Sequence, residues 1–267
     1  MSVAQNTALD SWLEATREHP TRCALFCDID GTLAPVVDRA DEARVPVEVC
    51  RLLGQLSARL HLVACVSGRG AADAKRLVGV GGVAYAGAHG AELLMPGSGE
   101  IERAPELEAW REPIRRFVAE LDSPELRRGD IRLEDKDFIQ ALHWRGAEDP
   151  EAVEALIKTI KESALKLGFE VHHGRKVLEI RPPIHFNKGI VVTRLAKPGV
   201  VRHAAYIGDD LTDIDAFRAL HLLREAGELD TALCVGVSSE EQPPGLAEEA
   251  DLMVAGPAGV TELLRSI

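Results

Sequence analysis

The feature that most constrains the fold is a set of short apolar runs in which hydrophobic residues follow one another without alternating with polar ones. Such runs are typical of parallel strands that are buried on both faces. Between the first two runs, Val45–Leu60 carries apolar residues at the spacing of an amphipathic helix. Strands that alternate with helices predict an α/β fold with a doubly wound parallel sheet. The runs are Ala24–Cys27, Leu62–Val66, Val83–Ala86, Ala204–Ile207, Leu233–Val237 and Leu252–Ala255.

The middle of the chain has a different pattern, in which two helices accompany two pairs of strands. The helices are predicted over Glu106–Leu121 and Glu151–Leu167, where apolar residues recur at helical spacing. We expect these elements to form a small α+β cap domain over residues 104–183. It is inserted into a parallel-sheet core domain that comprises residues 1–103 and 184–267. The strand pairs are Ile131–Lys136 with Phe138–Arg145, and Phe169–His173 with Lys176–Arg181.

The charge balance limits the classes of partner that the protein can bind, and the cysteines indicate the redox state of its compartment. Lys and Arg number 31 against 43 Asp and Glu, a net charge of −12, which disfavours binding to nucleic acid or to an anionic membrane. The longest apolar stretch, Val78–Ala88, is too short to span a bilayer. Residues 1–20 lack the apolar segment of a signal peptide. Five scattered cysteines favour reduced thiols. We therefore expect a cytoplasmic protein with no nucleic-acid or membrane partner.

Polar residues follow four of the predicted strands at their carboxyl ends. In open α/β sheets, ligands bind outside the carboxyl ends of the strands. Chance would distribute polar residues over both ends, so this one-sided grouping predicts a ligand site at one edge of the sheet. The segments are Asp28-Ile29-Asp30-Gly31-Thr32, Ser67-Gly68-Arg69, His89-Gly90 and Gly208-Asp209-Asp210-Leu211-Thr212-Asp213.

The first and last of these segments supply carboxylates that suit a cation. Asp28 and Asp30 are two residues apart, so on an extended strand end their side chains point the same way. Gly31 permits a sharp turn directly after them. With Asp209 arriving from another strand, these carboxylates form a hard oxygen site suited to Mg²⁺. A lone lysine, Lys188, supports a functional site here rather than a solvated turn.

Taken in chain order, four motifs resemble those of the haloacid dehalogenase-like (HAD) phosphatases, whose core is Rossmann-like. They are Asp28-Ile29-Asp30-Gly31-Thr32, Ser67, Lys188 and Gly208-Asp209-Asp210. The inserted domain lies where that family has its large α+β cap. Further segments resemble the trehalose-6-phosphate phosphatases, although Arg175 stands where lysine is common and Trp144 where tyrosine is common. These segments are Gly87-Ala88-His89-Gly90-Ala91-Glu92, Leu133-Glu134-Asp135-Lys136, Ala141-Leu142-His143-Trp144-Arg145, Val177-Leu178-Glu179-Ile180-Arg181-Pro182 and Gly208-Asp209-Asp210-Leu211-Thr212-Asp213.

The resemblance implies Mg²⁺-dependent hydrolysis of trehalose 6-phosphate to trehalose and phosphate, through an aspartyl-phosphate, in trehalose biosynthesis. Asp28 would attack phosphorus, and Asp30 would act first as an acid and then as a base. Asp28, the backbone carbonyl of Asp30, and Asp209 would hold Mg²⁺. Ser67 would donate a hydrogen bond to a phosphoryl oxygen, and Lys188 would screen the negative charge. The supporting residues are Thr32, Asp210 and Asp213.

Sugar recognition is expected mainly from the cap. Along Lys176–Arg181, Glu179 and Arg181 alternate with apolar residues and share a face with Arg175. An acid and a cation also share a face in the preceding hairpin. Cations near the site would offset the net charge of −12, which disfavours an anionic substrate. The expected substrate-binding residues are Arg69, His89, Glu134, Lys136, Arg175, Glu179 and Arg181.

Two other interpretations stay open at the level of sequence. The same chemistry could serve a different sugar phosphate, of the sucrose-phosphate or mannosyl-phosphoglycerate type. The second is a non-enzymatic sugar-phosphate sensor. A sensor would fit a chain that had lost its nucleophile or its metal-binding carboxylate, whereas Asp28 and Asp209 are both present in this sequence. The expected partners are a small-molecule sugar phosphate and, functionally, a separate trehalose-6-phosphate synthase.

Overall fold

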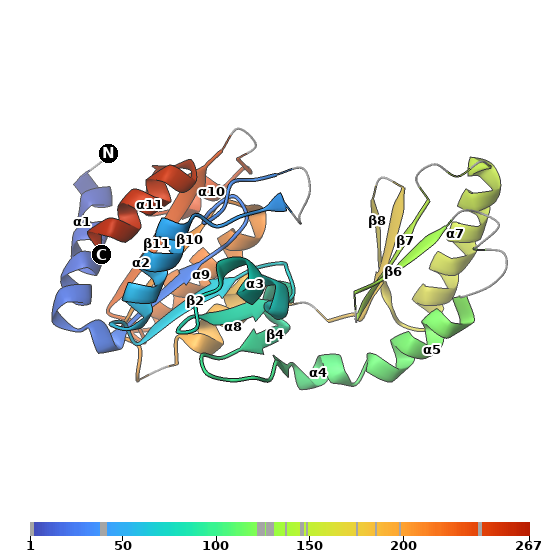
Figure 1. The fold of residues 1–267 in the computed structure, drawn as a ribbon, viewed down its shortest axis with the longest axis horizontal. Coiled ribbons are helices and arrows are strands. Elements are labelled where there is room, and N and C mark those ends of the chain that lie inside the picture. The colour runs from blue at the N-terminus through green and yellow to red at the C-terminus, as the bar shows by residue number, and fades with distance from the viewer. Residues whose placement is uncertain are drawn as a thin grey trace. The chain divides into compact units, whose positions relative to one another are not determined.

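The computed structural model describes residues 3–37, 42–121, 126, 131–136, 138–144, 147, 149–174, 176–184, 186–197, 199–239 and 242–267. The chain divides into two compact units. The first comprises Met1–Glu102 and Phe186–Ile267, and the second is Arg103–His185. The second unit is therefore an insertion in the sequence of the first. Figure 1 labels many of the elements of both.

Within the described residues, the first unit is built around an eight-stranded sheet in the order β12-β11-β10-β1-β2-β3-β4-β5. The first six of these strands are parallel, and the six predicted runs overlap them. β4 (Glu92–Leu94) pairs with β3 in the antiparallel sense, and β5 (Glu102–Arg103) is one of the two edge strands. The parallel strands are β1 (Cys23–Cys27), β2 (Leu62–Val66), β3 (Ala84–Gly87), β10 (His203–Gly208), β11 (Thr231–Ser238) and β12 (Leu252–Ala255).

Helices cover both faces of this sheet because its central strands are apolar on both faces. In β1, Leu25 and Cys27 belong to one hydrophobic core, whereas Ala24 and Phe26 belong to the other. The predicted doubly wound parallel sheet is confirmed. The first core is covered by α1 (Val3–Glu18), α2 (Val47–Ser57), α3 (Ala71–Val78) and α11 (Gly256–Ser266), and the second by α8 (Lys188–Leu195), α9 (Leu211–Glu225) and α10 (Leu246–Glu249).

The second unit contains a four-stranded antiparallel sheet in the order β6-β7-β9-β8. One face packs against helices in a core that includes Ile114, Phe117, Ile157 and Leu178. The elements are α4 (Pro105–Glu108), α5 (Arg111–Leu121), β6 (Arg132–Lys136), β7 (Ile139–His143), α7 (Pro150–Lys166), β8 (Glu170–Gly174) and β9 (Val177–Arg181).

Two predicted helices differ from those observed. The helix expected over Val45–Leu60 spans only Val47–Ser57, with Pro46 as its N-cap residue. Val45 precedes this proline, and a residue before proline is disfavoured in the helical region. The helix expected over Glu106–Leu121 is divided into α4 and α5. Pro113 explains the division: proline has no N–H to donate to the carbonyl four residues earlier, so it is tolerated only in the first turn of a new helix.

In the described part of the chain, no helix is both long enough and apolar enough to cross a membrane.

Candidate active site

The carboxyl edge of the first unit's sheet brings the predicted catalytic side chains to one place. Asp28 follows β1, Ser67 follows β2 and Asp209 follows β10, and these three strands are neighbours in the sheet. The Asp28 N–H donates to the Ile207 carbonyl at 2.9 Å, so the β1–β10 pairing continues past the end of β1. The strand order therefore places all three residues at the same edge.

Lys188 is a buried cation that joins two of the carboxylates. Its side chain comes from the first turn of α8, which the Asn187 side chain caps by accepting a hydrogen bond from the Ile190 N–H at 2.9 Å. The Lys188 Nζ donates to Asp28 Oδ1 and to Asp213 Oδ1, at 2.7 Å each, and Lys188 is 1% exposed. Burial alone would lower its pKa, but the charges of Asp28 and Asp213 outweigh burial and raise it.

Asp28 is a carboxylate held away from water beside other carboxylates. Its pKa lies well above the ordinary range, chiefly because burial disfavours the charged form. The Lys188 ammonium opposes this shift, while the charges of Asp213 and Asp209 add to it. A further positive charge close to Asp28 would therefore favour its ionised form.

Asp213 is the acid of this site whose carboxylate oxygens accept the most hydrogen bonds. Its Oδ1 accepts from the Tyr206 hydroxyl at 2.6 Å as well as from Lys188, and its Oδ2 accepts from the N–H groups of Asp209 and Asp210 at 2.9 Å each. Gly208 makes this packing feasible, since a Cβ there would lie 2.2 Å from the Asp213 Cγ. Asp213 therefore orients Lys188 and the loop after β10.

Asp209 is held by a hydroxyl and by a glycine. The Thr32 Oγ1 donates to Asp209 Oδ1 at 2.9 Å. Gly31 has a φ of +83°, and a Cβ at that position would lie 2.0 Å from Asp209 Oδ2. Burial raises the pKa of Asp209 to about 6, although the Thr32 hydroxyl acts in the opposite direction. The turn after β1 therefore packs against the loop after β10 through the carboxylate of Asp209.

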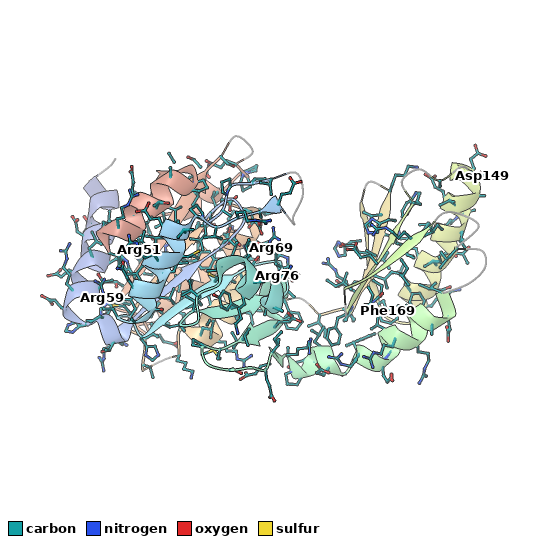
Figure 2. The ribbon with its side chains drawn as sticks, in the orientation of Figure 1. Arg51, Arg59, Arg69, Arg76, Asp149 and Phe169 are labelled. Atoms are coloured by element: carbon teal, nitrogen blue, oxygen red, sulfur yellow. The ribbon has the colours of Figure 1, made fainter. Side chains whose placement is uncertain are left out.

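Asp30 accepts a two-pronged hydrogen bond from Arg69, whose side chain is labelled in Figure 2. The Nε–Oδ2 and Nη2–Oδ1 distances are both 2.6 Å. The hydrogen bonds to Asp30 raise the pKa of Arg69. The Arg69 N–H also donates to the Ser67 Oγ at 3.1 Å. Arg69, which the sequence predicted to bind substrate, is therefore directed at the predicted general acid.

Three of the predicted sugar-binding residues of the second unit, Glu134, Glu179 and Arg181, share one face of its sheet. The register aligns Glu134 with Ala141, Ala141 with Glu179, and Glu179 with His172 in one row across the four strands. His143 Nε2 lies 2.8 Å from Glu134 Oε2, and Arg181 bonds His172. Leu142 and Leu178 point to the opposite, buried face. Lys136 ends β6, and Arg175 lies outside the described residues.

Comparison with known proteins decides the family. The trehalose-phosphatase family model matches residues 26–243. The chain belongs to this family. A trehalose-phosphate phosphatase of Mycobacterium avium is 36% identical over 210 residues, which cover 76% of this chain and 51% of that protein. A probable trehalose-phosphate phosphatase of Sinorhizobium fredii is 33% identical over 253 residues, which cover 92% and 84%. The chain thus spans only about half the length of mycobacterial phosphatases such as that of M. avium, and 15% of a Mycobacterium tuberculosis relative described as an uncharacterized glycosyl hydrolase.

A solved structure extends the comparison over nearly the whole fold. The trehalose-6-phosphate phosphatase of Aspergillus fumigatus is 27% identical, covers 96% of both chains and superposes with a TM-score of 0.62. The resemblance to trehalose-6-phosphate phosphatases, which the further sequence segments indicated, is confirmed.

The donor set of this trehalose-phosphatase family member fits a divalent cation. Asp28, Asp209 and Asp213 each offer an oxygen, and these oxygens lie within 4.8 Å of one another. Because both oxygens of Asp213 already accept two hydrogen bonds each, Asp28 and Asp209 are the better ligands. All three donors are carboxylates, the ligand type that Mg²⁺ prefers. An added cation would also favour the ionised forms of Asp28 and Asp209.

Sequence reasoning missed Tyr206 and Glu92. Tyr206 is fully buried in β10, and its hydroxyl is bonded to Asp213. The sequence feature that could have identified Tyr206 is its hydroxyl group within an otherwise apolar run. Glu92 Oε2 accepts from the Ala71 N–H at 2.9 Å, at the start of α3. It was quoted within a motif but received no role, because the sequence does not show that the end of β3 faces the start of α3.

Proposed function

We propose that this protein is a Mg²⁺-dependent phosphatase that hydrolyses trehalose 6-phosphate to trehalose and phosphate, in trehalose biosynthesis. The observation that supports this most directly is the buried Asp28, whose Oδ1 accepts a 2.7 Å hydrogen bond from Lys188 at the carboxyl edge of the sheet. Membership of the trehalose-phosphatase family supports the substrate.

The chemistry proceeds in two steps with Asp28 as nucleophile. Lys188 engages Oδ1, so the attack is assigned to Oδ2, which forms a bond to phosphorus while the bond from phosphorus to the sugar oxygen breaks. Asp30 gives a proton to that departing oxygen. A water molecule then attacks phosphorus and passes its proton to Asp30. The bond from phosphorus to Asp28 breaks, and the products are free carboxylate and phosphate.

The surrounding residues bind and orient the phosphoryl group. Ser67 donates to a phosphoryl oxygen and Lys188 screens the charge between Asp28 and the phosphoryl group. Asp28, the Asp30 carbonyl and Asp209 would hold Mg²⁺, which supplies positive charge against the repulsion between carboxylate and phosphate. Arg69 binds Asp30 in the structure described. We assign it to the substrate anion during turnover, because Asp30 has to be released before it can transfer a proton.

The second unit is proposed as the cap that recognises the sugar. The row that contains Glu134 and Glu179 presents acids on the face opposite the core, where they suit sugar hydroxyls. Arg181 extends from the same strand as Glu179.

A cytoplasmic location and a functional pairing with a separate trehalose-6-phosphate synthase complete the proposal. All five cysteines are free thiols, in keeping with a reducing compartment. The substrate itself is the product of glycosyl transfer onto a sugar phosphate, which is the reaction that such a synthase performs.

Phosphate release from a panel of sugar phosphates tests the proposal. Trehalose 6-phosphate should be the preferred substrate over sucrose 6-phosphate and mannosyl-phosphoglycerate, and chelation of Mg²⁺ should abolish release. Asp28→Asn should lose activity by about 10⁴-fold or more while it stays folded. A preference for another sugar phosphate would reassign the substrate. Release from no member of the panel would favour a sugar-phosphate sensor, and an active Asp28→Asn would exclude Asp28 as the nucleophile.

A further inference from the structure

The segment Gly87–Glu92 is strained where it follows β3. It forms a short 3₁₀ turn, Ala88–Gly90, and then enters β4. Ala88 and His89 have φ values of +48° and +56°, and Gly90 has +105°. Residues other than glycine are uncommon in this left-handed region, so the surrounding contacts have to hold Ala88 and His89 there. Such strain concentrates at functional sites.

Backbone hydrogen bonds hold this segment against the loop that carries Ser67 and Arg69. The Ala88 N–H donates to the Arg69 carbonyl at 2.8 Å, and the His89 N–H donates to the Ser67 carbonyl at 3.0 Å. The Ser67 N–H in turn donates to the Ala86 carbonyl at 2.9 Å. The pairing of β2 with β3 thus continues into the loop that contains two of the proposed phosphate-site residues.

Glu92 fixes the other end of the same loop. The N-cap residue of α3 is Gly70, which has no side chain to cap the helix, and Glu92 Oε2 accepts from the Ala71 N–H instead. A carboxylate at a helix N-terminus is also favoured by the helix dipole. The fit is close, since a Cβ on Gly87 would lie 2.1 Å from the Ala71 nitrogen.

The segment also contacts the helix that begins with Lys188. A Cβ on Gly90 would lie 2.8 Å from the Val191 Cβ and 3.5 Å from the Asn187 carbonyl oxygen. On the opposite side, a Cβ on Gly68 would lie 2.9 Å from atoms of the His89 ring. One strained turn is therefore packed between the Ser67–Ala71 loop and the start of α8.

We propose that Gly87–Glu92 is a brace that sets Ser67 and Arg69 in position relative to Lys188, with Glu92 and His89 as its positioning residues. Glu92 acts through the Ala71 N–H and His89 acts through the Gly68 backbone. The role in turnover rests on the proposed phosphatase function. Because the brace serves the phosphoryl site and not the sugar, its loss affects every phosphate ester alike.

The main test compares Glu92→Ala with Glu92→Gln, and uses Glu100→Ala, an exposed glutamate of the same unit, as the matched control. We expect Glu92→Ala to lower kcat by about tenfold on both trehalose 6-phosphate and p-nitrophenyl phosphate, with KM nearly unchanged. Glu92→Gln retains an acceptor oxygen for the Ala71 N–H and should restore kcat to about half the wild-type value or better. Wild-type kcat in Glu92→Ala, or no recovery in Glu92→Gln, would overturn the brace.

A second variant tests His89 without altering Glu92. Gly68→Ala adds a methyl group against the His89 ring and should reduce kcat as Glu92→Ala does. His89→Ala removes the ring, so Gly68→Ala combined with His89→Ala should be no less active than Gly68→Ala alone. Additive losses in the double variant would remove His89 from the proposal.

Hydrogen exchange separates failure of the brace from failure of the proposed function. The Ala71 amide should exchange about tenfold faster in Glu92→Ala than in the wild type or in Glu92→Gln. This measurement needs no substrate. If the wild type hydrolyses no phosphate ester and the exchange difference is found, the proposed function fails and the brace stands as a structural element. Unchanged exchange overturns the brace whatever the activity.

Discussion

Some residues at this site contribute because they have no side chain, and Gly31 is the clearest case. Gly31 and Gly199 both have a φ of +83°, but a Cβ would meet Asp209 Oδ2 at 2.0 Å in the first and nothing within 4 Å in the second. Alanine at either position carries the same backbone cost of about 1–2 kcal/mol. Gly31→Ala should lower the free energy of unfolding by about 2 kcal/mol more than Gly199→Ala, and should weaken Mg²⁺ binding. Denaturant unfolding and calorimetric titration measure both effects, and equal losses would contradict the steric argument.

The protonation of Asp209 makes a second prediction at the residue scale. Its pKa is raised by burial from 3.8 to about 6, so the folded metal-free protein holds this proton more tightly than the unfolded chain. The stability that this group contributes is therefore full below about pH 4 and is lost as the pH rises through about 6. Asp209→Asn should remove this loss, which amounts to up to about 3 kcal/mol at pH 7.

Thermal unfolding of the metal-free wild type and of Asp209→Asn between pH 4 and 7 measures that difference. The curve of Tm against pH should be flatter for the variant. Because Mg²⁺ binds the ionised carboxylate, the Tm increase that Mg²⁺ gives the wild type should grow over the same interval. A wild-type protein that gains stability relative to the variant as the pH rises would contradict the assignment.

At the scale of elements, the second unit's sheet predicts a separation between sugar recognition and phosphate chemistry. Glu179 lies in the same row as Glu134, between Ala141 on β7 and His172 on β8. Glu179→Ala should raise KM for trehalose 6-phosphate by about tenfold and leave p-nitrophenyl phosphate within about twofold. Glu162→Ala, on the exposed face of α7, is the matched control. Equal losses on the two substrates would refute a sugar-reading role for Glu179.

The elements also show why some of the site could be predicted from the sequence and some could not. The apolar run Ala24–Cys27 followed by Asp28 was sufficient to place this acid, because burial and the carboxyl-end rule are local patterns. Lys188 and Asp28 lie 160 residues apart in the chain, and nothing in either segment encodes their 2.7 Å contact. The bond between Arg69 and Asp30 depends in the same way on two strands being neighbours. The sequence therefore supplies the candidates, while the tertiary contacts decide which atoms meet.

At the scale of the whole molecule, the two units have separate hydrophobic cores, and the proposed Mg²⁺ ligands all lie in the first. A cation that binds only the folded first unit stabilises that unit by about 2.7 kcal/mol at a free concentration one hundred times its Kd. For a unit of this size, that corresponds to a Tm increase of about 5–10 °C. Scanning calorimetry should therefore show two transitions, of which Mg²⁺ raises one.

Asp209→Asn removes a proposed Mg²⁺ ligand, so it identifies the unit whose unfolding transition responds to Mg²⁺. In Asp209→Asn, the Mg²⁺-dependent increase should disappear, while the transition of Arg103–His185 keeps its wild-type Tm. Glu179→Ala, altered in the second unit, should show the full Mg²⁺ effect. A Tm increase that appears in both transitions, or that persists in Asp209→Asn, would mean that the cation is held elsewhere than at Asp28 and Asp209.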